Sequence, residues 1–225
     1  MAEALRRGME VMVLQRGRSV RAVPSGAVPL VADYDDPAAT RAALGSLRFD
    51  AVAQFIGYRP EQVASDVELL SGRTAQYLFV SSASVYRKPP STPWITESAP
   101  LGNAFWQYAR DKIACEETLG RAFRERGFPA TIVRPSHTYA DGWIPTSLGS
   151  RDYTVARRIE QGRPIVVHGD GSSLWSLTHA EDFARAFVAL MGNHRTVGEA
   201  FHMTTDELLS WDQIHLTLAA ALGVE

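Results

Sequence analysis

The chain has 225 residues, a length that suits one large domain or one and a half. Hydrophobic residues make up 45% and charged residues 21%, which is ordinary for a globular protein and argues against intrinsic disorder. The net charge of −2 gives no electrostatic argument for a nucleic-acid or anionic-membrane partner, and the single cysteine, Cys115, excludes a disulfide framework.

Targeting and metal signals are absent from the sequence. No stretch approaches the roughly 18 apolar residues of a membrane span. Residues 1–8 lack the apolar centre of a secretory signal. The six histidines are scattered without the pairing that metal ligands show, so we expect no metal site. These observations predict a cytoplasmic protein with no membrane partner.

Short strand-like runs alternate with helix-like runs in the first half of the chain. Strands are predicted at 10–15, 28–31, 51–55 and 75–82, and helices at 37–47 and 60–70. Each helix begins on a proline, whose missing N–H costs nothing at the first helical position. Asp36 is the expected N-cap of the first of them.

The second half continues this alternation after a proline-rich loop. We predict helices at 104–125, 153–161, 180–191 and 211–222, strands at 130–133, 164–167 and 200–203, and a turn at 168–173. A capping box of Ser210 and Gln213 should open the last helix. Alternating strands and helices predict a doubly wound α/β fold with a parallel sheet, which binds ligands beyond the carboxyl ends of its strands.

Tyr108 and Lys112 form a Y-x-x-x-K pair on the long predicted helix. A spacing of four places both side chains on one helix face. An ammonium group near a phenol lowers the pKa of the phenol, which would make Tyr108 a general acid/base near neutral pH. Lysine is scarce, since only Lys88 and Lys112 occur. The spacing alone fits equally well with a solvated helix face over a packed tyrosine.

Serines gather at the carboxyl end of the strand predicted at 75–82. Ser81, Ser82 and Ser84 belong to the run SSASVY. A hydroxyl at this point can hydrogen-bond a substrate oxygen in the crevice at the sheet edge. Turn serines that cap the end of the strand are the alternative.

Together these elements resemble the extended short-chain dehydrogenase/reductase group, and more closely the NAD-dependent epimerase/dehydratase family. The resemblance covers nearly the whole chain and rests on SSASVY, Y-x-x-x-K, RPSHTY at 134–139, HGDG at 168–171 and LTHAEDFA at 177–184. It implies a Rossmann-like domain at 1–140 and a partial substrate region at 141–225, with elements that return to the first domain. It also implies NAD or NADP as cofactor, a sugar or nucleotide-sugar-like substrate, and the option of a homodimer.

The resemblance assigns roles by motif position. Tyr108 would move the proton at the reacting hydroxyl or carbonyl, Lys112 would lower the pKa of Tyr108 and bind the nicotinamide ribose, and Ser82 would hold the reacting oxygen. Further cofactor contacts are implied for Asp33 and Tyr34 at the adenine, for Phe55, Ile56 and Gly57 at the nicotinamide ribose, and for Ser81, Pro135, Ser136 and His137. Substrate contacts are implied for Ser84, Trp106 and His137. Many members have an asparagine where His137 stands, so the identity of the substrate stays open.

Two arginines favour NADP weakly. Arg16 and Arg18 follow the first predicted strand, where NAD-specific sites usually place an acid and where arginine accommodates a 2′-phosphate. A solvated turn explains these residues about equally well.

The family begins with a strand and a G-x-x-G-x-x-G turn that seats the pyrophosphate on a helix N-terminus. Neither is found in this sequence, so we expect a sheet without its first strand and weak dinucleotide binding by the chain as printed. The chain would then be either a piece of an active enzyme or a catalytically impaired remnant with a regulatory or ligand-binding role. Ala83 and Ser84, rather than an acid, follow Ser82, which favours epimerase or reductase chemistry slightly over dehydration.

Overall fold

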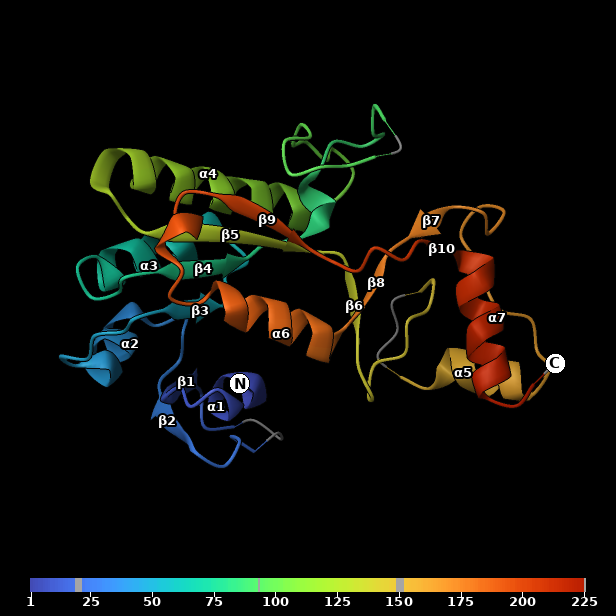
Figure 1. Cartoon of the computed structure of the whole chain (residues 1–225), viewed down its shortest axis with the longest axis horizontal. Coiled ribbons are helices and arrows are strands. Elements are labelled where there is room, and N and C mark those ends of the chain that lie inside the picture. The colour runs from blue at the N-terminus through green and yellow to red at the C-terminus, as the bar shows by residue number, and fades with distance from the viewer. Residues whose placement is uncertain (19–21, 93, 149–151, 225) are drawn as a thin grey trace. The chain divides into compact units, whose positions relative to one another are not determined.

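The computed structural model describes residues 1–18, 22–92, 94–148 and 152–224 (Figure 1). The chain divides into two compact units. The first unit comprises Met1–Arg134 and Ala184–His202, and the second comprises Pro135–Phe183 and Met203–Glu225. The predicted domain boundary at residue 140 stays a prediction.

The first unit is built on two sheets. The larger sheet has four strands in the order β3-β4-β5-β9, and β3, β4 and β5 run parallel. These strands are β3 (Val52–Gln54), β4 (Tyr77–Val80), β5 (Ala130–Pro135) and β9 (Ala200–Met203). The smaller sheet pairs β1 (Val11–Gln15) with β2 (Ala27–Val31), also in parallel. Within the described ranges no strand joins the two sheets. The predicted α/β fold with a parallel sheet is confirmed.

Helices connect the strands of the first unit and cover the sheet. They are α1 (Ala2–Arg6), α2 (Pro37–Leu44), α3 (Pro60–Leu70), α4 (Gln107–Arg126) and α6 (Ala180–Leu190), with 3-10 turns η1 (Ala83–Val85) and η2 (His194–Thr196). The Asp36 side chain accepts hydrogen bonds from the amides of Ala38 and Ala39, so the predicted cap of α2 is confirmed. Gly127 ends α4 in the left-handed region, with φ 65° and ψ 23°.

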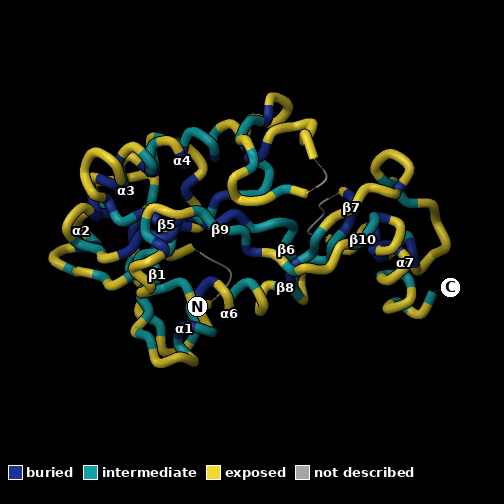
Figure 2. Tube along the Cα trace, turned by 45° about the horizontal axis from the view of Figure 1, so that its top comes forward, coloured by how far each residue is buried: buried dark blue, intermediate teal, exposed yellow. Residues whose placement is uncertain are grey.

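The core of the first unit lies where α3 and α4 pack on β4 (Figure 2). Tyr77, Leu78 and Phe79 of β4 are fully buried. A strand covered on both faces reads as a continuous apolar run, which is why its sequence predicts it so clearly. This packing fixes α4 against the sheet and so determines which of its side chains meet the strand ends.

The second unit contains two short sheets and two helices. Strand β6 (His137–Tyr139) pairs in parallel with β8 (Leu177–His179), and β7 (Leu174–Trp175) pairs antiparallel with β10 (Leu209–Ser210). The helices are α5 (Thr154–Glu160) and α7 (Trp211–Ala221). The capping box of Ser210 and Gln213 opens α7 as predicted.

One predicted strand is wrong. Residues 164–167 form no strand, and Val166 is 62% exposed. The Val166 carbonyl accepts a hydrogen bond from the Ser147 hydroxyl, 2.5 Å away, instead of entering a ladder. The apolar residues after Pro164 resemble a strand in sequence, but they have no partner strand to pair with in the described part of the chain. Among the described residues, no helix is long and apolar enough to cross a bilayer.

Candidate active site

The candidate site of the first unit lies at the carboxyl ends of β3 and β4. Ser82 lies two residues beyond the end of β4 and caps η1, because its extended backbone lets its hydroxyl accept from the Ser84 amide at 3.1 Å. Tyr108 and Lys112 lie in the first two turns of α4. The structure therefore brings the predicted serine, tyrosine and lysine to one edge of the sheet.

Lys112 is held in the protein interior, with only 1% of its surface exposed. Its ammonium group donates to the carbonyl of Gly57 at 2.8 Å and to that of Val80 at 2.7 Å. Burial disfavours the charged form and lowers the pKa of Lys112 to about 8. Since an ammonium group has three protons, one remains for a ligand after these two bonds.

Aromatic rings surround this ammonium group. Its nitrogen lies 4.5 Å from the ring centroid of Phe79, 5.0 Å from that of Tyr58 and 5.9 Å from that of Tyr108. The Tyr108 ring in turn lies 6.2 Å from Tyr58 and 4.7 Å from Trp106. Tyr58 is not predicted as a site residue, although it follows the predicted segment 55–57 directly. Such rings stabilise a cation that has lost most of its water.

The predicted lowering of the Tyr108 pKa by Lys112 is not found. Burial raises the pKa of Tyr108, and the nearby Tyr58 raises it further, while a hydrogen bond with the Ser82 side chain opposes the rise. The expectation that Lys112 lowers this pKa ignored the depth of the phenol, which the sequence does not reveal. A neutral Tyr108 at neutral pH is equipped to donate a proton.

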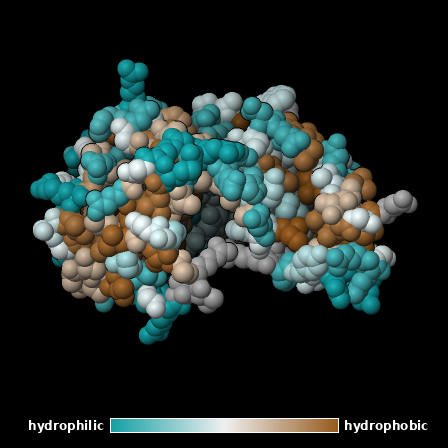
Figure 3. All heavy atoms as spheres, turned by 60° about the horizontal axis from the view of Figure 1, so that its bottom comes forward, coloured by the Kyte–Doolittle hydropathy of each residue, from teal (hydrophilic) through white to brown (hydrophobic). Residues whose placement is uncertain are grey.

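Segment 55–57, which the family resemblance places at the nicotinamide ribose, borders Lys112. Phe55 and Ile56 are 50% and 47% exposed, and Phe55 also packs on Phe187 with centroids 5.2 Å apart. Apolar residues stand among hydrophilic ones on the protein surface (Figure 3). Half-exposed apolar side chains beside a buried ammonium group form a surface that a flat ligand would cover.

The other predicted cofactor residues of the first unit follow β1 and β2. Arg16 and Arg18 are exposed just beyond β1. After β2, the Asp33 carboxylate accepts from the Asp35 amide at 3.1 Å, which makes a local turn. The Tyr34 hydroxyl donates to Asp66 at 2.9 Å, so this phenol is engaged within the protein.

Behind the site lies a buried ion pair that sequence reasoning missed. The Ser81 hydroxyl donates to Glu116 at 2.5 Å, and Glu116 pairs with Arg134 through bonds of 3.1 Å and 2.6 Å. The arginine and glutamate side chains are 7% and 4% exposed. Both residues lie next to motifs that the sequence reveals, since Glu116 is one turn beyond Lys112 and Arg134 opens the RPSHTY motif. The Ser81 hydroxyl is thus engaged within the protein, and its amide donates to the Val133 carbonyl at 2.7 Å.

Ser84 and the remaining predicted residues differ in their surroundings. The Ser84 hydroxyl is buried and has no hydrogen-bond partner among the described residues. Pro135, Ser136 and His137 belong to the second unit. There the His137 ring packs edge-on against Trp175 and Trp211, with centroids 6.1 Å away in both cases, and burial lowers its pKa.

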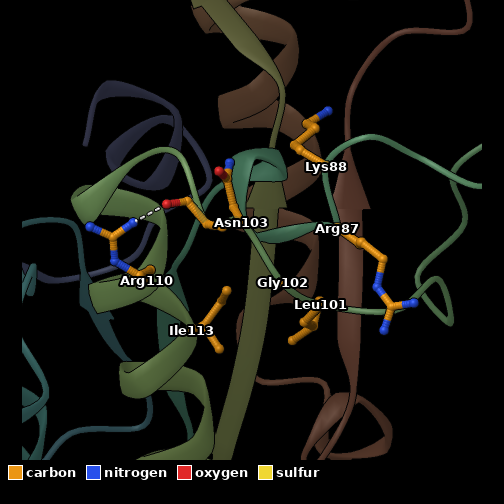
Figure 4. A pocket seen from close by; sticks show the side chains of 8 residues that line it. Arg87, Lys88, Leu101, Gly102, Asn103, Arg110 and Ile113 are labelled. Carbon is orange, nitrogen blue, oxygen red and sulfur yellow. Dashed lines mark hydrogen bonds between the residues drawn. The ribbon is translucent and has the colours of Figure 1, made fainter.

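A separate pocket of about 470 Å³ lies beside α4 (Figure 4). It is lined by Arg87, Lys88, Leu101, Gly102, Asn103, Ala104, Arg110 and Ile113, and none of the predicted catalytic residues is among them. Its three cationic side chains point in different directions, and Arg110 donates to the Ala104 carbonyl at 2.6 Å. The basic residues therefore do not converge on a common ligand.

A parallel α/β sheet whose strand ends meet a buried lysine and a tyrosine one helical turn away is typical of Rossmann-like enzymes of the extended short-chain dehydrogenase/reductase group. The chain belongs to the NAD dependent epimerase/dehydratase family, whose model matches residues 1–203.

Two curated relatives are similar over most of the chain. The 2′-dehydrokanamycin reductase of Streptomyces kanamyceticus is 27% identical over 213 residues, which are 95% of this chain and 60% of that protein. The chloroplast stem-loop binding protein of 41 kDa b of Arabidopsis thaliana is 28% identical over 191 residues, 85% of this chain and 47% of that protein. The chain thus spans less than two thirds of the length of either relative.

The fold is shared with solved enzymes. The dTDP-glucose 4,6-dehydratase DesIV of Streptomyces venezuelae, solved with NAD bound, matches with a TM-score of 0.80 at 18% identity, over 100% of this chain and 77% of that one. The predicted Rossmann-like fold is confirmed.

Proposed function

We propose that this chain carries the proton-transfer site of an NAD(P)-dependent oxidoreductase that acts on a sugar or nucleotide-sugar-like substrate. The observation that carries this proposal is the grouping of Ser82, Tyr108 and Lys112 at the carboxyl ends of β3 and β4. Epimerase and reductase chemistry both need a group that moves a proton at the reacting oxygen. The similarity to a protein named as a reductase supports reduction as one form of the activity.

The residues present fit the nicotinamide end of the cofactor. Lys112 keeps one proton for a ribose hydroxyl after its bonds to Gly57 and Val80. Phe55 and Ile56 offer half-exposed apolar surface beside it. When bound, the cofactor supplies the hydride chemistry, and the protein supplies orientation and proton transfer.

Four residues of the chain would take part in substrate binding and proton transfer. The Ser82 hydroxyl, which accepts from the Ser84 amide, would donate to the reacting oxygen of the substrate. Tyr108, kept neutral by burial, would donate its proton to that oxygen during reduction and take it back in the reverse direction. Lys112 would stabilise the phenolate that this transfer leaves behind. The Ser84 hydroxyl, which has no partner in the part of the chain that the structure describes, is suited to a further substrate oxygen.

The preference between NAD and NADP rests on the loop beyond β1. Arg16 and Arg18 are exposed there, and a guanidinium group suits a 2′-phosphate. Titrating the purified protein with NADPH and NADH, followed by nicotinamide fluorescence, tests this part of the proposal. Tighter binding of NADH would contradict it.

The activity itself is tested by replacing the phenol. Nicotinamide oxidation is followed with a set of keto-sugars for wild type, Tyr108→Phe and Tyr153→Phe, the last being an exposed tyrosine of the second unit. We expect Tyr108→Phe to lower kcat by about 10²–10⁴-fold, the usual contribution of a positioned acid/base, while Tyr153→Phe stays at the wild-type rate. Equal rates in wild type and Tyr108→Phe would remove Tyr108 from the mechanism.

A ligand-binding role without turnover is the second candidate, and one relative named as a stem-loop binding protein favours it. The net charge of −2 argues against nucleic acid as the ligand. Cofactor binding without oxidation of NADPH by any keto-sugar would favour this candidate over the enzyme.

A further inference from the structure

A buried carboxylate in the first unit has no role in the mechanism above. Asp66 of α3 is 4% exposed, and its Oδ2 atom accepts from three side chains. The donors are Tyr77 at 2.6 Å, Gln54 at 2.7 Å and Tyr34 at 2.9 Å. All three are neutral groups. A buried charge is costly unless it is both paired with an opposite charge and hydrogen-bonded, and neutral donors supply only the hydrogen bonds, so this arrangement needs a reason.

The donors come from three different elements. Tyr34 follows β2, Gln54 ends β3, and Tyr77 opens β4. Asp66 thus ties the loop beyond the smaller sheet to the edge strand of the larger one. Tyr34 and segment 55–57 are the two places in this unit where the family resemblance puts the two ends of a dinucleotide.

Gln54 passes this restraint to the candidate site. Its amide nitrogen is bound to Asp66, which orients its Oε1 atom to accept from the Ile56 amide at 2.8 Å. Gly57 packs closely against the Gln54 side chain, because a Cβ atom added at position 57 would lie 3.2 Å from Gln54 Cγ. The Gly57 carbonyl accepts one of the two internal bonds of Lys112. A continuous series of contacts therefore leads from Asp66 to the ammonium group.

We propose that Asp66 is a positioning residue that, through Gln54, fixes segment 55–57 and so holds the Gly57 carbonyl against Lys112. The proposal rests on the proposed function only in treating Lys112 as part of the active site. The dependence of the Ile56 amide on the acceptor at position 66 can be tested whether or not the protein has enzymatic activity.

The chemistry of the network allows a rescue experiment. All three donors use the Oδ2 atom of Asp66, so Asp66→Leu removes the acceptor while keeping a similar volume. In Asp66→Asn the introduced amide oxygen can take the place of Oδ2 and accept all three hydrogen bonds. The asparagine variant also lacks the carboxyl charge, so comparing the two variants separates loss of the acceptor from loss of the charge.

The test uses the unliganded protein and two readouts by NMR: hydrogen exchange of the Ile56 amide and the pKa of the Lys112 ammonium group. We expect Asp66→Leu to speed Ile56 exchange by about tenfold, the effect of losing one hydrogen bond, and to lower the pKa of Lys112 further. Asp66→Asn, which keeps the acceptor, should leave both readouts close to wild type. Glu68→Gln, an exposed change on the same helix, is the control and should leave both unchanged.

Unchanged Ile56 exchange in Asp66→Leu would overturn the proposal, and so would an Asp66→Asn variant that behaves like Asp66→Leu. If Asp66→Leu does not fold, Gln54→Glu decides, because it keeps an oxygen for the Ile56 amide but loses the donor to Asp66. Faster Ile56 exchange in Gln54→Glu supports the proposal, and wild-type exchange refutes it. Inactivity of the wild-type protein toward keto-sugars would refute the proposed function and leave these exchange results intact.

Discussion

At the scale of single residues, the candidate site is governed by burial. Lys112 and Cys115 are neighbours on α4, and both are almost fully enclosed. Burial lowers the pKa of Lys112 to about 8 and raises the pKa of Cys115 to about 12, because each group is driven to its neutral form. These two shifts act on stability in opposite directions as the pH rises.

The signs follow from proton linkage. Unfolded lysine titrates near ~10.4, above the folded value, so Lys112 adds stability as pH rises from about 8 to ~10.4. Unfolded cysteine titrates near ~8.5, below the folded value, so Cys115 removes stability above ~8.5. We expect wild-type stability to change little across this window. Across the same pH window, the free energy of unfolding of Cys115→Ala should rise by about 2 kcal/mol with increasing pH. That of Lys112→Met should fall by a similar amount. Urea denaturation at a series of pH values measures both, and parallel profiles for the two variants would contradict the assignment.

Sequence reasoning reached the residues that sit at fixed offsets on regular elements. Ser82, Tyr108 and Lys112 were predicted because a strand end and a helical spacing of four place them. Tyr58 and Asp66 were missed because their roles arise from contacts between elements distant in the chain. The direction of the Tyr108 pKa was missed for the same reason, since the depth of a side chain is a property of the packed unit.

At the scale of elements, α4 presents three polar side chains to the sheet. Tyr108, Lys112 and Glu116 follow one another at intervals of four, so they line one face of the helix. Glu116 joins α4 to β5 through Arg134, whose guanidinium group also donates to the Tyr86 hydroxyl at 2.9 Å. This pair anchors the helix behind its two polar residues.

Breaking the buried pair from one side should be costly. Glu116→Gln leaves the Arg134 charge enclosed without its carboxylate, and we expect a loss of about 3–5 kcal/mol in the free energy of unfolding. The double variant Glu116→Gln with Arg134→Met should lose less than the two single variants combined. Urea denaturation of the four proteins provides the cycle. Glu68→Gln, which breaks an exposed pair with Arg126, serves as control and should show no resolvable change. Strict additivity would show that the buried pair is not coupled.

At the scale of the whole molecule, the first unit depends on a segment that returns late in the chain. Gln76 is fully buried, and its NH₂ group donates to the Leu190 carbonyl at 3.1 Å and the Thr196 hydroxyl at 2.9 Å. Its carbonyl oxygen accepts from the Gly192 amide at 2.8 Å. One side chain from before β4 therefore satisfies three groups of the returning segment 184–202. Helix 180–191 and strand 200–203 are predicted from the sequence, but this link is not. A single glutamine at the start of a strand does not indicate which distant groups its side chain will bind.

Replacing that side chain tests the link. Gln76→Leu keeps the volume but leaves the Gly192 amide and Leu190 carbonyl without their partner, at about 1–3 kcal/mol for each buried group left unsatisfied. We expect a clear drop in the urea midpoint for Gln76→Leu and none for Gln161→Leu, an exposed glutamine of the second unit. A midpoint equal to wild type in both variants would show that the returning segment is held by other contacts.

The placement of β9 beside β5 has a consequence for synthesis. Ribosomes add about 5–20 residues per second, so several seconds separate the emergence of these two neighbouring strands. During that interval the nascent chain exposes the backbone edge of β5 with nothing to cover it, and such an edge attracts other extended polypeptides. Yield of the soluble protein in a host cell should accordingly depend on chaperones that bind the emerging chain until β9 is made.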